Sequence, residues 1–272
     1  MRHIKYFFGN LAFVTVLIAI FTIVFIVMGN TVYIYFIYRA AEAEYSQLRS
    51  IAPARIILDG AIDAEEENQS SVLSAFDEFS DNIDLYSSDG MEEEDEYDDY
   101  SDLNPSDDLE QINPGYMGWI FMENTRIDYP VVRGADNTMY MDHTFRGLRN
   151  RAGAIFMDFR CYEGFETPLT VLYGHNSRNG SMFASLHNVS VGDFIHVTTR
   201  DDITYAYRIY EIRLTSIRDS SYTLIGKDRE VVIDFIYDEL NARRGSTHLL
   251  LLSTCVHSHD PDDRLVVLAV RY

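Results

Sequence analysis

The chain has 272 residues, a formal net charge of −21 and two cysteines. This length fits one sizeable domain with additional segments, and two cysteines are too few for a disulfide-rich secreted scaffold. The charge is concentrated, because residues 61–110 contain 20 of the 43 acidic residues and no Lys or Arg. The rest of the chain is close to neutral and has no basic region typical of nucleic-acid binding, so we expect no nucleic-acid partner.

The N-terminal segment is strongly apolar. No charged residue occurs from Tyr6 to Tyr38, and about 20 apolar residues span a bilayer as a helix. Residues 1–40 therefore predict a membrane anchor helix. Three tyrosines near its end are typical of the membrane interface: Tyr33, Tyr35 and Tyr38.

A cleaved signal peptide is the alternative for this segment, because "AEA" at 41–43 resembles a cleavage site. The apolar run is longer than that of a signal peptide, which favours an uncleaved anchor. Basic residues lie on both sides of the run, so counting Lys and Arg does not set its orientation.

Residues 41–110 are predicted to form an acidic, flexible linker. A short helix fits within 40–60 before Pro53, and scattered hydrophobic residues allow an amphipathic helix near 70–80. Elsewhere the dense like charge disfavours a packed core and favours a solvated spacer. Calcium binding is the alternative, but the run lacks the spaced Asp and Gly residues of a calcium loop.

Residues 111–272 have the pattern of a mostly β domain, predicting an antiparallel barrel or sandwich. Strands are expected on both sides of a turn at 123–125, and further along the chain at 152–159, 169–175, 193–199, 203–217, 248–254 and 264–271. Pro130 indicates an edge strand. The alternation within 203–217 slips by one residue after Ile209, which predicts a β-bulge. Residues 229–245 have helical spacing and stop at Gly245.

A candidate nucleophile lies between the last two apolar runs, "LLLLSTC" and "RLVVLAV". Cysteine reacts as the thiolate, and its ordinary pKa of about 8.5 means that Cys255 needs an activating neighbour. His175 is the strongest candidate, because it ends the apolar run "TVLYGH" and precedes the polar turn "NSRNG". Arg264 begins the last run. Taken singly, each residue also has an ordinary explanation, as a buried thiol, a loop histidine and a surface cation.

The segment "HSHDPDD" at 257–263 could be a metal-binding loop. Zinc sites usually draw their ligands from separate elements, so a solvated loop is favoured. We expect no metal and no other cofactor.

Three motifs resemble those of sortases, the cysteine transpeptidases of Gram-positive cell surfaces, and the candidate residues follow the family's order of His, Cys and Arg. "LLSTC" followed by "RLVV" is similar to the active-site signature, and "VLYGHNSRNGSMFASL" (171–186) resembles the histidine segment. "GWIFMENTRIDYPVVRGADNTMYMDHTF" (118–145) resembles the start of the sortase barrel. The resemblance covers roughly 113–272 and implies an eight-stranded β-barrel with added helices as the catalytic domain, 111–272.

Class B sortases are the most similar group, through "GSMFASL", the long segment before the barrel and the helix at 229–244. The C-terminal membrane helix and Asp-Pro-aromatic lid motif common in class C are not found in this sequence. Leu251 departs from the family pattern, which usually has threonine there. We expect this change to alter local packing rather than the chemistry.

The resemblance implies a membrane-anchored transpeptidase. Cys255 would attack the threonine carbonyl of a C-terminal sorting motif in a surface protein, and an amine of a lipid II-type peptidoglycan precursor would accept the acyl group. His175 would act as general acid and base, and Arg264 would stabilise the oxyanion. Ser253 and Thr254 are candidate substrate-binding residues.

The resemblance also implies a cytoplasmic N-terminus and an extracellular catalytic domain, spaced from the membrane by the acidic segment. Three alternatives stay open: a non-catalytic surface module that binds sorting signals, a thiol hydrolase, and a pilin-polymerising sortase.

Overall fold

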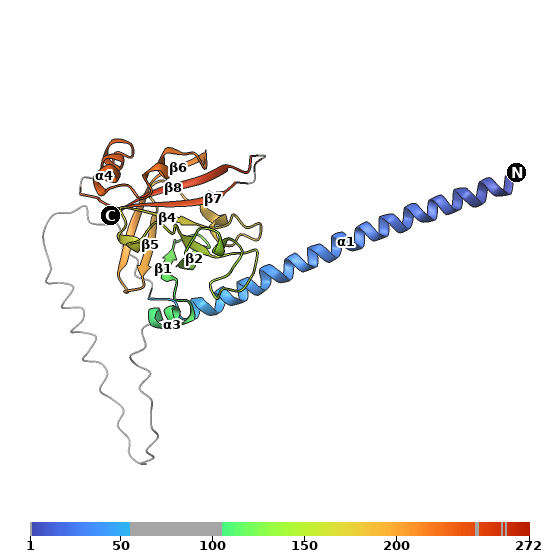
Figure 1. Ribbon diagram of the computed structural model, residues 1–272, viewed down its shortest axis with the longest axis horizontal. Helices are drawn as coiled ribbons and strands as arrows, with labels where there is room; N and C mark the ends of the chain where they lie inside the picture. The colour runs from blue at the N-terminus through green and yellow to red at the C-terminus, as the bar shows by residue number, and fades with distance from the viewer. Residues whose placement is uncertain (1, 55–104, 243–244, 257, 259) are drawn as a thin grey trace, which may run out of the picture. The chain divides into compact units, whose positions relative to one another are not determined.

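Eight strands form a closed barrel in the order β1-β2-β3-β4-β7-β8-β6-β5. The computed structural model describes residues 2–54, 105–242, 245–256, 258 and 260–272 (Figure 1). The strands are β1 (Tyr116–Phe121), β2 (Asp128–Arg133), β3 (Ile155–Met157), β4 (Leu169–Tyr173), β5 (Phe194–Thr199), β6 (Thr204–Ser216), β7 (Leu249–Cys255) and β8 (Asp263–Arg271). The mostly β, eight-stranded barrel implied by the resemblance is confirmed.

Two strand pairs in the barrel are parallel, β2 with β3 and β4 with β7. The prediction of an antiparallel barrel is wrong for these pairs, because side-chain alternation does not reveal which strands become neighbours. Parallel neighbours require long connections. Residues 134–154 supply the first, and β5, β6 and the following helix lie within the second.

The prediction of an edge strand at Pro130 is also wrong, because β2 pairs with both β1 and β3. Pairing with the three-residue β3 begins at Val131, so Pro130 lies beyond it and needs no ladder donor on that side. The predicted bulge in β6 is confirmed, since its register with β8 shifts between Ile209 and Glu211.

Three α-helices and four short 3-10 helices accompany the barrel. They are α1 (Arg2–Ser50), α3 (Pro105–Ile112), α4 (Arg229–Asp238), η2 (Met139–Met141), η3 (Gly164–Glu166), η4 (Phe183–Asn188) and η5 (Ser220–Leu224). α4 ends before the predicted stop at Gly245. Asn241 has a positive φ of 48°, a left-handed conformation that a helix does not continue through.

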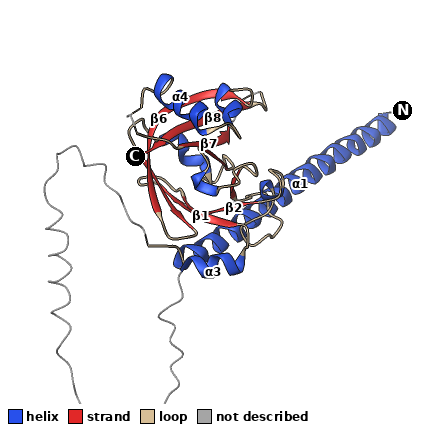
Figure 2. Ribbon diagram, turned by 60° about the vertical axis from the view of Figure 1, so that its left-hand side comes forward, coloured by secondary structure: helices blue, strands red, loops and turns tan. Residues whose placement is uncertain are grey.

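Apolar side chains pack in two layers, one inside the barrel and one outside it beneath α4. Leu250 and Leu252 of β7 belong to the inner layer, whereas Leu249 and Leu251 belong to the outer layer, as the alternation of a strand requires. Figure 2 shows α4 beside the strands of this outer face. Leu251 is fully buried there, which explains how an apolar residue fits this position.

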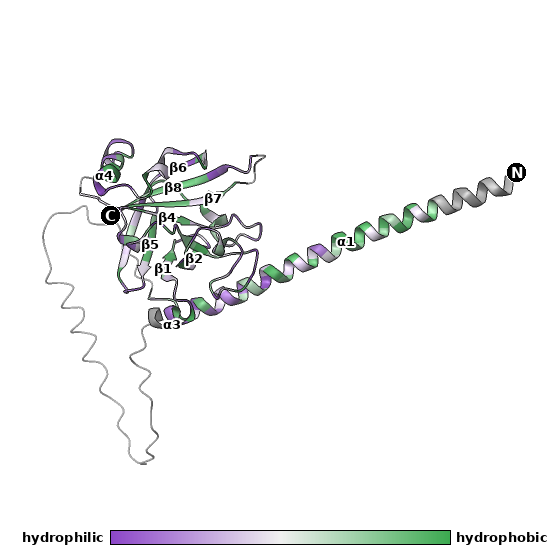
Figure 3. Ribbon diagram, in the orientation of Figure 1, coloured by the Kyte–Doolittle hydropathy of each residue, from purple (hydrophilic) through white to green (hydrophobic). Residues whose placement is uncertain are grey.

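The N-terminal helix α1 continues past the predicted boundary at residue 40. Between Phe13 and Ser50 it is long and apolar enough to cross a membrane, judged by length and composition, and Figure 3 shows its hydrophobic stretch. Its last turns pack on the barrel, because Ala41, Tyr45 and Leu48 are buried in the inner cluster. This one-sided spacing is typical of an amphipathic helix.

Hydrogen bonds join these last turns of α1 to the connection between β2 and β3. The Tyr45 hydroxyl donates to Gly153 O at 2.7 Å and accepts from Phe145 N at 3.3 Å. The Asn150 side chain donates to Ile37 O at 3.0 Å. Residues 41–50 therefore belong to the barrel's core rather than to a linker.

α1 reaches the barrel before the acidic segment begins, and residues 55–104 of the predicted linker lie outside the described residues. Tyr38, expected at a membrane interface, instead packs partly buried against the inner cluster. α3 lies beside the last turns of α1 in Figure 2 and buries Leu109 in the same cluster, although 105–110 were assigned to the linker. The amphipathic helix predicted near 70–80 falls outside the described residues.

Candidate active site

The parallel pairing of β4 with β7 sets the position of the candidate site. Their register runs from Leu169 opposite Leu249 to Tyr173 opposite Ser253. Because parallel strands end at the same edge of a sheet, this register brings together the two chain segments that follow. His175 lies two residues beyond β4, and Cys255 is the last residue of β7.

Three hydrogen bonds fasten these two segments to each other. Gly174 N donates to Ser253 O at 3.3 Å, and the Thr254 hydroxyl donates to Gly174 O at 2.7 Å. The Asn176 side chain donates to Cys255 O at 3.0 Å. The backbone on both sides of His175 is therefore tied to the backbone beside Cys255.

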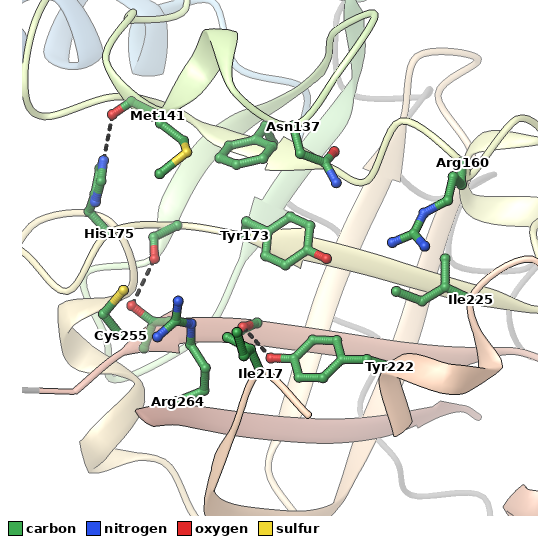
Figure 4. Close-up of a pocket in the computed structure, with 14 residues that line it drawn as sticks. Asn137, Met141, Arg160, Tyr173, His175, Ile217, Tyr222, Ile225, Cys255 and Arg264 are labelled. Carbon is green, nitrogen blue, oxygen red and sulfur yellow. Dashed lines mark hydrogen bonds between the residues drawn. The ribbon is translucent and has the colours of Figure 1, made fainter. Parts of the chain in front are cut away.

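The ring of His175 is held by the connection between β2 and β3. Its Nε2 lies 2.6 Å from Met141 O (Figure 4). A carbonyl can only accept, so Nε2 carries the proton and Nδ1 is the ring nitrogen left for proton transfer. Gly153 lies against the ring, and a Cβ there would be 2.9 Å from His175 Cδ2 and 2.7 Å from Tyr140 O. A side chain at Gly153 would displace the histidine.

Cys255 and Arg264 are directly opposite each other in the antiparallel pair of β7 and β8. By strand alternation both point outward, on the same face as Leu251. Cys255 is a free, exposed thiol. The Arg264 Nη1 donates to the carbonyls of Pro261 and Asp263 at 2.7 and 2.8 Å. Among the described residues Arg264 has no carboxylate partner, so its positive charge is available to an anion.

All five predicted site residues line one cavity of about 490 Å³. These residues are His175, Ser253, Thr254, Cys255 and Arg264. Figure 4 shows Cys255 and Arg264 side by side at one end of this cavity, with His175 next to Cys255. The arrangement suits nucleophilic catalysis, which needs a thiol, a proton-transfer group and a cation at one place.

A sortase domain model matches residues 120–272 of the chain. The chain belongs to the sortase family. Its curated relatives include Sortase B of Listeria monocytogenes, 28% identical over 174 residues that cover 59% of this chain and 71% of the relative. Sortase B of Staphylococcus aureus is 31% identical over 131 residues, covering 48% of this chain and 52% of the relative.

The solved structures that resemble the chain include sortase B of Clostridium perfringens. That structure has a TM-score of 0.53 and 27% identity, and the match covers 61% of this chain and 98% of that chain. The protein is a sortase-type cysteine transpeptidase, most like class B sortases.

The two residues before Cys255, Ser253 and Thr254, are buried and hydrogen-bonded. The Ser253 Oγ lies 2.6 Å from the hydroxyl of Tyr222, in η5. Burial raises the pKa of Tyr222, although Arg264 opposes the shift, so this hydroxyl stays protonated. The Thr254 hydroxyl donates a hydrogen bond to Gly174 O at 2.7 Å. Sequence reasoning missed Tyr222 because η5 has no periodic pattern that marks it.

The other end of the sortase cavity carries a buried ionic network. Arg160 donates to both carboxylate oxygens of Asp158 at 2.8 Å, and Asn137 and Tyr173 donate to Oδ2 at 2.9 and 3.0 Å. Burial acts to raise the pKa of Asp158, but hydrogen bonds from Arg160, Asn137 and Tyr173 outweigh it and lower the pKa to about 2. The network fixes the Arg160 cation in the cavity lining. Only tertiary structure brings these four residues together.

Cys161 is a free, buried thiol, so it does not mask Cys255 as a disulfide partner. Its Sγ donates to Leu169 O at 3.5 Å, and burial raises its pKa to about 11. This confirms the expectation of a free or buried Cys161. In the described part of the chain no three His, Cys, Asp or Glu residues form a metal-binding group. His257 and His259 of the alternative metal loop lie outside it.

Proposed function

We propose that this sortase is membrane-anchored, cleaves sorting motifs after threonine and transfers the surface protein to an amine of a peptidoglycan precursor. The observation that carries the proposal is the pairing of an exposed Cys255 thiol with Arg264 in the cavity that His175 also lines. A pure binding module would not need this combination of groups.

In the first half-reaction, the Cys255 thiolate attacks the threonine carbonyl carbon and forms a C–S bond. The Arg264 cation faces the negative charge that develops on the carbonyl oxygen. Protonated His175 then gives its Nδ1 proton to the departing amine as the C–N bond breaks. A thioester acyl-enzyme remains.

In the second half-reaction, the acceptor amine attacks the thioester carbon. Neutral His175 takes a proton from this amine at Nδ1, a new amide bond forms, and the Cys255 thiolate leaves. Arg264 again stabilises the oxyanion. Water in place of the amine gives hydrolysis, so the outcome depends on whether an amine reaches the thioester first.

Two further residues are given separate roles in this proposal. Ser253 lines the cavity beside Tyr222, which supports a contact with the bound motif. Thr254 already donates its hydroxyl to Gly174. We therefore assign Thr254 to holding the His175 segment in place.

The proposed location is the cell membrane, with a cytoplasmic N-terminus and an extracellular barrel. The length and apolar composition of α1 support a single span. The "AEA" sequence lies within α1, and Ala41 is buried against the barrel, which supports an uncleaved anchor. The partners proposed are surface proteins with a sorting motif and a lipid II-type amine.

The test uses the full chain in detergent micelles, because the last turns of α1 are part of the barrel core. A library of short sorting-motif peptides is incubated with an amine acceptor, and the products are separated by chromatography. We expect a ligated peptide that requires Cys255. Cys255→Ala should abolish it, whereas Cys161→Ala, which removes the other thiol, should retain it.

Three results would contradict this proposal. Cys255-dependent cleavage without ligation to any amine would indicate a thiol hydrolase. Peptide binding without cleavage would indicate a sorting-signal-binding module. Ligation that succeeds with pilin lysines but fails with peptidoglycan amines would favour a pilin-polymerising sortase.

A further inference from the structure

A second cavity, of about 520 Å³, is formed by the β1–β2 turn, the segment after His175 and η4. The chain that leaves β4 lines both cavities, since Gly174 and His175 line the first while Asn176 and Ser177 line the second. A ligand in the second cavity would therefore lie one residue from the proposed proton-transfer group.

Most residues that line the second cavity have polar or charged side chains. Its residues are Asn124, Thr125, Arg126, Asn176, Ser177, Arg178, Gly180, Ala184, Ser185, His187 and Asn188. The first cavity also has apolar and aromatic walls, including Met141, Phe156 and Ile217. The polar side chains of the second cavity can therefore hydrogen-bond to a polar ligand.

A buried hydroxyl in this lining has no internal partner. Ser177 is 6% exposed, and its Oγ makes no hydrogen bond with any residue that the structure describes. Buried polar groups are nearly always hydrogen-bonded in native proteins, so an exception needs an explanation. A polar ligand in the cavity would supply the missing partner.

Positive charge dominates the same lining, which includes two arginines and no Asp or Glu. Arg178 is exposed and makes no ion pair or hydrogen bond within the described part of the chain. Arg126 is fixed, because its Nη1 donates to Asn179 O at 2.8 Å. A Cβ at Gly180 would approach that nitrogen to 2.8 Å, so glycine gives the guanidinium its room. An anionic ligand is favoured.

A hydrogen bond also connects the lining of the second cavity to Cys255. Asn176 lines the cavity and donates to Cys255 O. We propose that the second cavity binds the acceptor substrate, a primary amine that carries a nearby anionic group. This inference rests on the proposed function and adds the site of its second substrate. A peptide carboxylate and a phosphate both supply the required anion.

A binding titration tests the cavity without turnover. The full-length Cys255→Ala chain in detergent micelles is titrated by calorimetry with triglycine, with triglycinamide, which lacks the carboxylate, and with inorganic pyrophosphate. Arg178→Gln should weaken anion binding about tenfold, the effect expected for one charge-assisted hydrogen bond. Ser177→Ala, a nearly isosteric change, should also weaken it. Arg208→Gln, an exposed arginine on β6 outside both cavities, is the matched control.

The probes distinguish the two sources of the anion. Tighter binding of triglycine than of triglycinamide would identify a carboxylate, whereas binding of pyrophosphate alone would identify a phosphate. Either result supports the inference if it depends on Arg178. Equal effects of Arg178→Gln and Arg208→Gln, or no binding of any anion, would overturn it.

The second half-reaction gives an independent readout. With a peptide that acylates Cys255 and a fixed triglycine concentration, Arg178→Gln should lower the ratio of ligated to hydrolysed product. An unchanged ratio would contradict the inference. If no peptide acylates the chain, the proposed function fails, and the titration still decides whether the cavity binds anions.

Discussion

At the scale of single residues, strand alternation explains why Leu251 and Cys255 share a face but not an environment. Both point outward from β7, and Leu251 is covered by the layer beneath α4 while Cys255 lies beyond it. The family threonine would place a hydroxyl in that apolar layer. We therefore expect leucine in place of the family threonine at position 251 to affect packing rather than catalysis.

We predict that Leu251→Thr lowers the free energy of unfolding by about 2 kcal/mol, through lost apolar contacts and a buried hydroxyl. Leu214→Thr is the control, because Leu214 of β6 is 74% exposed, and it should change little. Denaturant unfolding in one detergent measures both. Lost acylation of Cys255 with unchanged stability would contradict a packing role.

Asp158 gives a pH-dependent prediction at the same scale. Its pKa is about 2 in the fold, below the ordinary 3.8, so the ionised carboxylate stabilises the native state. That stabilisation is complete above pH 4 and is lost as the pH falls toward 2.

Asp158→Asn should therefore lower the free energy of unfolding at pH 7 by about 2 kcal/mol, the size of hydrogen bonds to a charged group. The difference in free energy of unfolding between Asp158→Asn and the parent should become smaller as the pH falls below 4. Unfolding curves at several pH values measure it. Asp201→Asn, at an exposed position, is the control and should show neither effect. A loss of stability in Asp158→Asn that does not depend on pH would contradict the ionic network.

At the scale of elements, α1 supports the connection that holds His175. Tyr45 is hydrogen-bonded to Gly153 O and Phe145 N, and Met141 of the same connection accepts a hydrogen bond from His175. A side chain at Gly153 would meet the His175 ring. α1 is thus part of the framework of the candidate active site.

Tyr45→Phe should lower the free energy of unfolding by about 1–2 kcal/mol, because it leaves Gly153 O and Phe145 N without their buried partner. Tyr33→Phe removes a hydroxyl from a residue of α1 that is 62% exposed and should be neutral. Thermal unfolding of both variants in the same micelles tests this. Equal melting temperatures would show that the Tyr45 bonds do not hold the connection.

Among the elements, the sequence predicts the strands and the candidate site residues but not which strands become neighbours. Alternation located the strands and the bulge near Ile209, and motif spacing brought His175, Cys255 and Arg264 to one site. Alternation carries no information on strand partners, so the parallel pairs were missed. The buried positions of Ala41, Tyr45 and Leu48 were hidden among charged neighbours, and Tyr222 and the Asp158 network depend on tertiary contacts.

At the scale of the whole molecule, side-chain packing holds the last turns of α1 against the barrel. The hydrogen bonds that join α1 to the barrel come from residues between Ile37 and Arg49. We therefore expect that the acidic charge of residues 61–100 is not needed to hold the barrel against α1.

Replacing residues 61–100 with a neutral Gly/Ser sequence of equal length should leave the melting temperature unchanged. It should also leave Cys255 acylation unchanged at low and high salt. The parent chain under the same conditions is the control. A salt-dependent change confined to the parent would instead assign a cation-sensitive, regulatory role to the acidic charge.

The central claim is that Cys255 carries the acyl group, and intact-mass spectrometry tests it most directly. The full chain is mixed with a peptide that it cleaves, without acceptor, and an amine is then added. We predict a mass increase equal to the peptide through its threonine, located on Cys255, absent in Cys255→Ala and discharged as ligated product when the amine arrives. Ligated product from Cys255→Ala, or an adduct on another residue, would contradict the account.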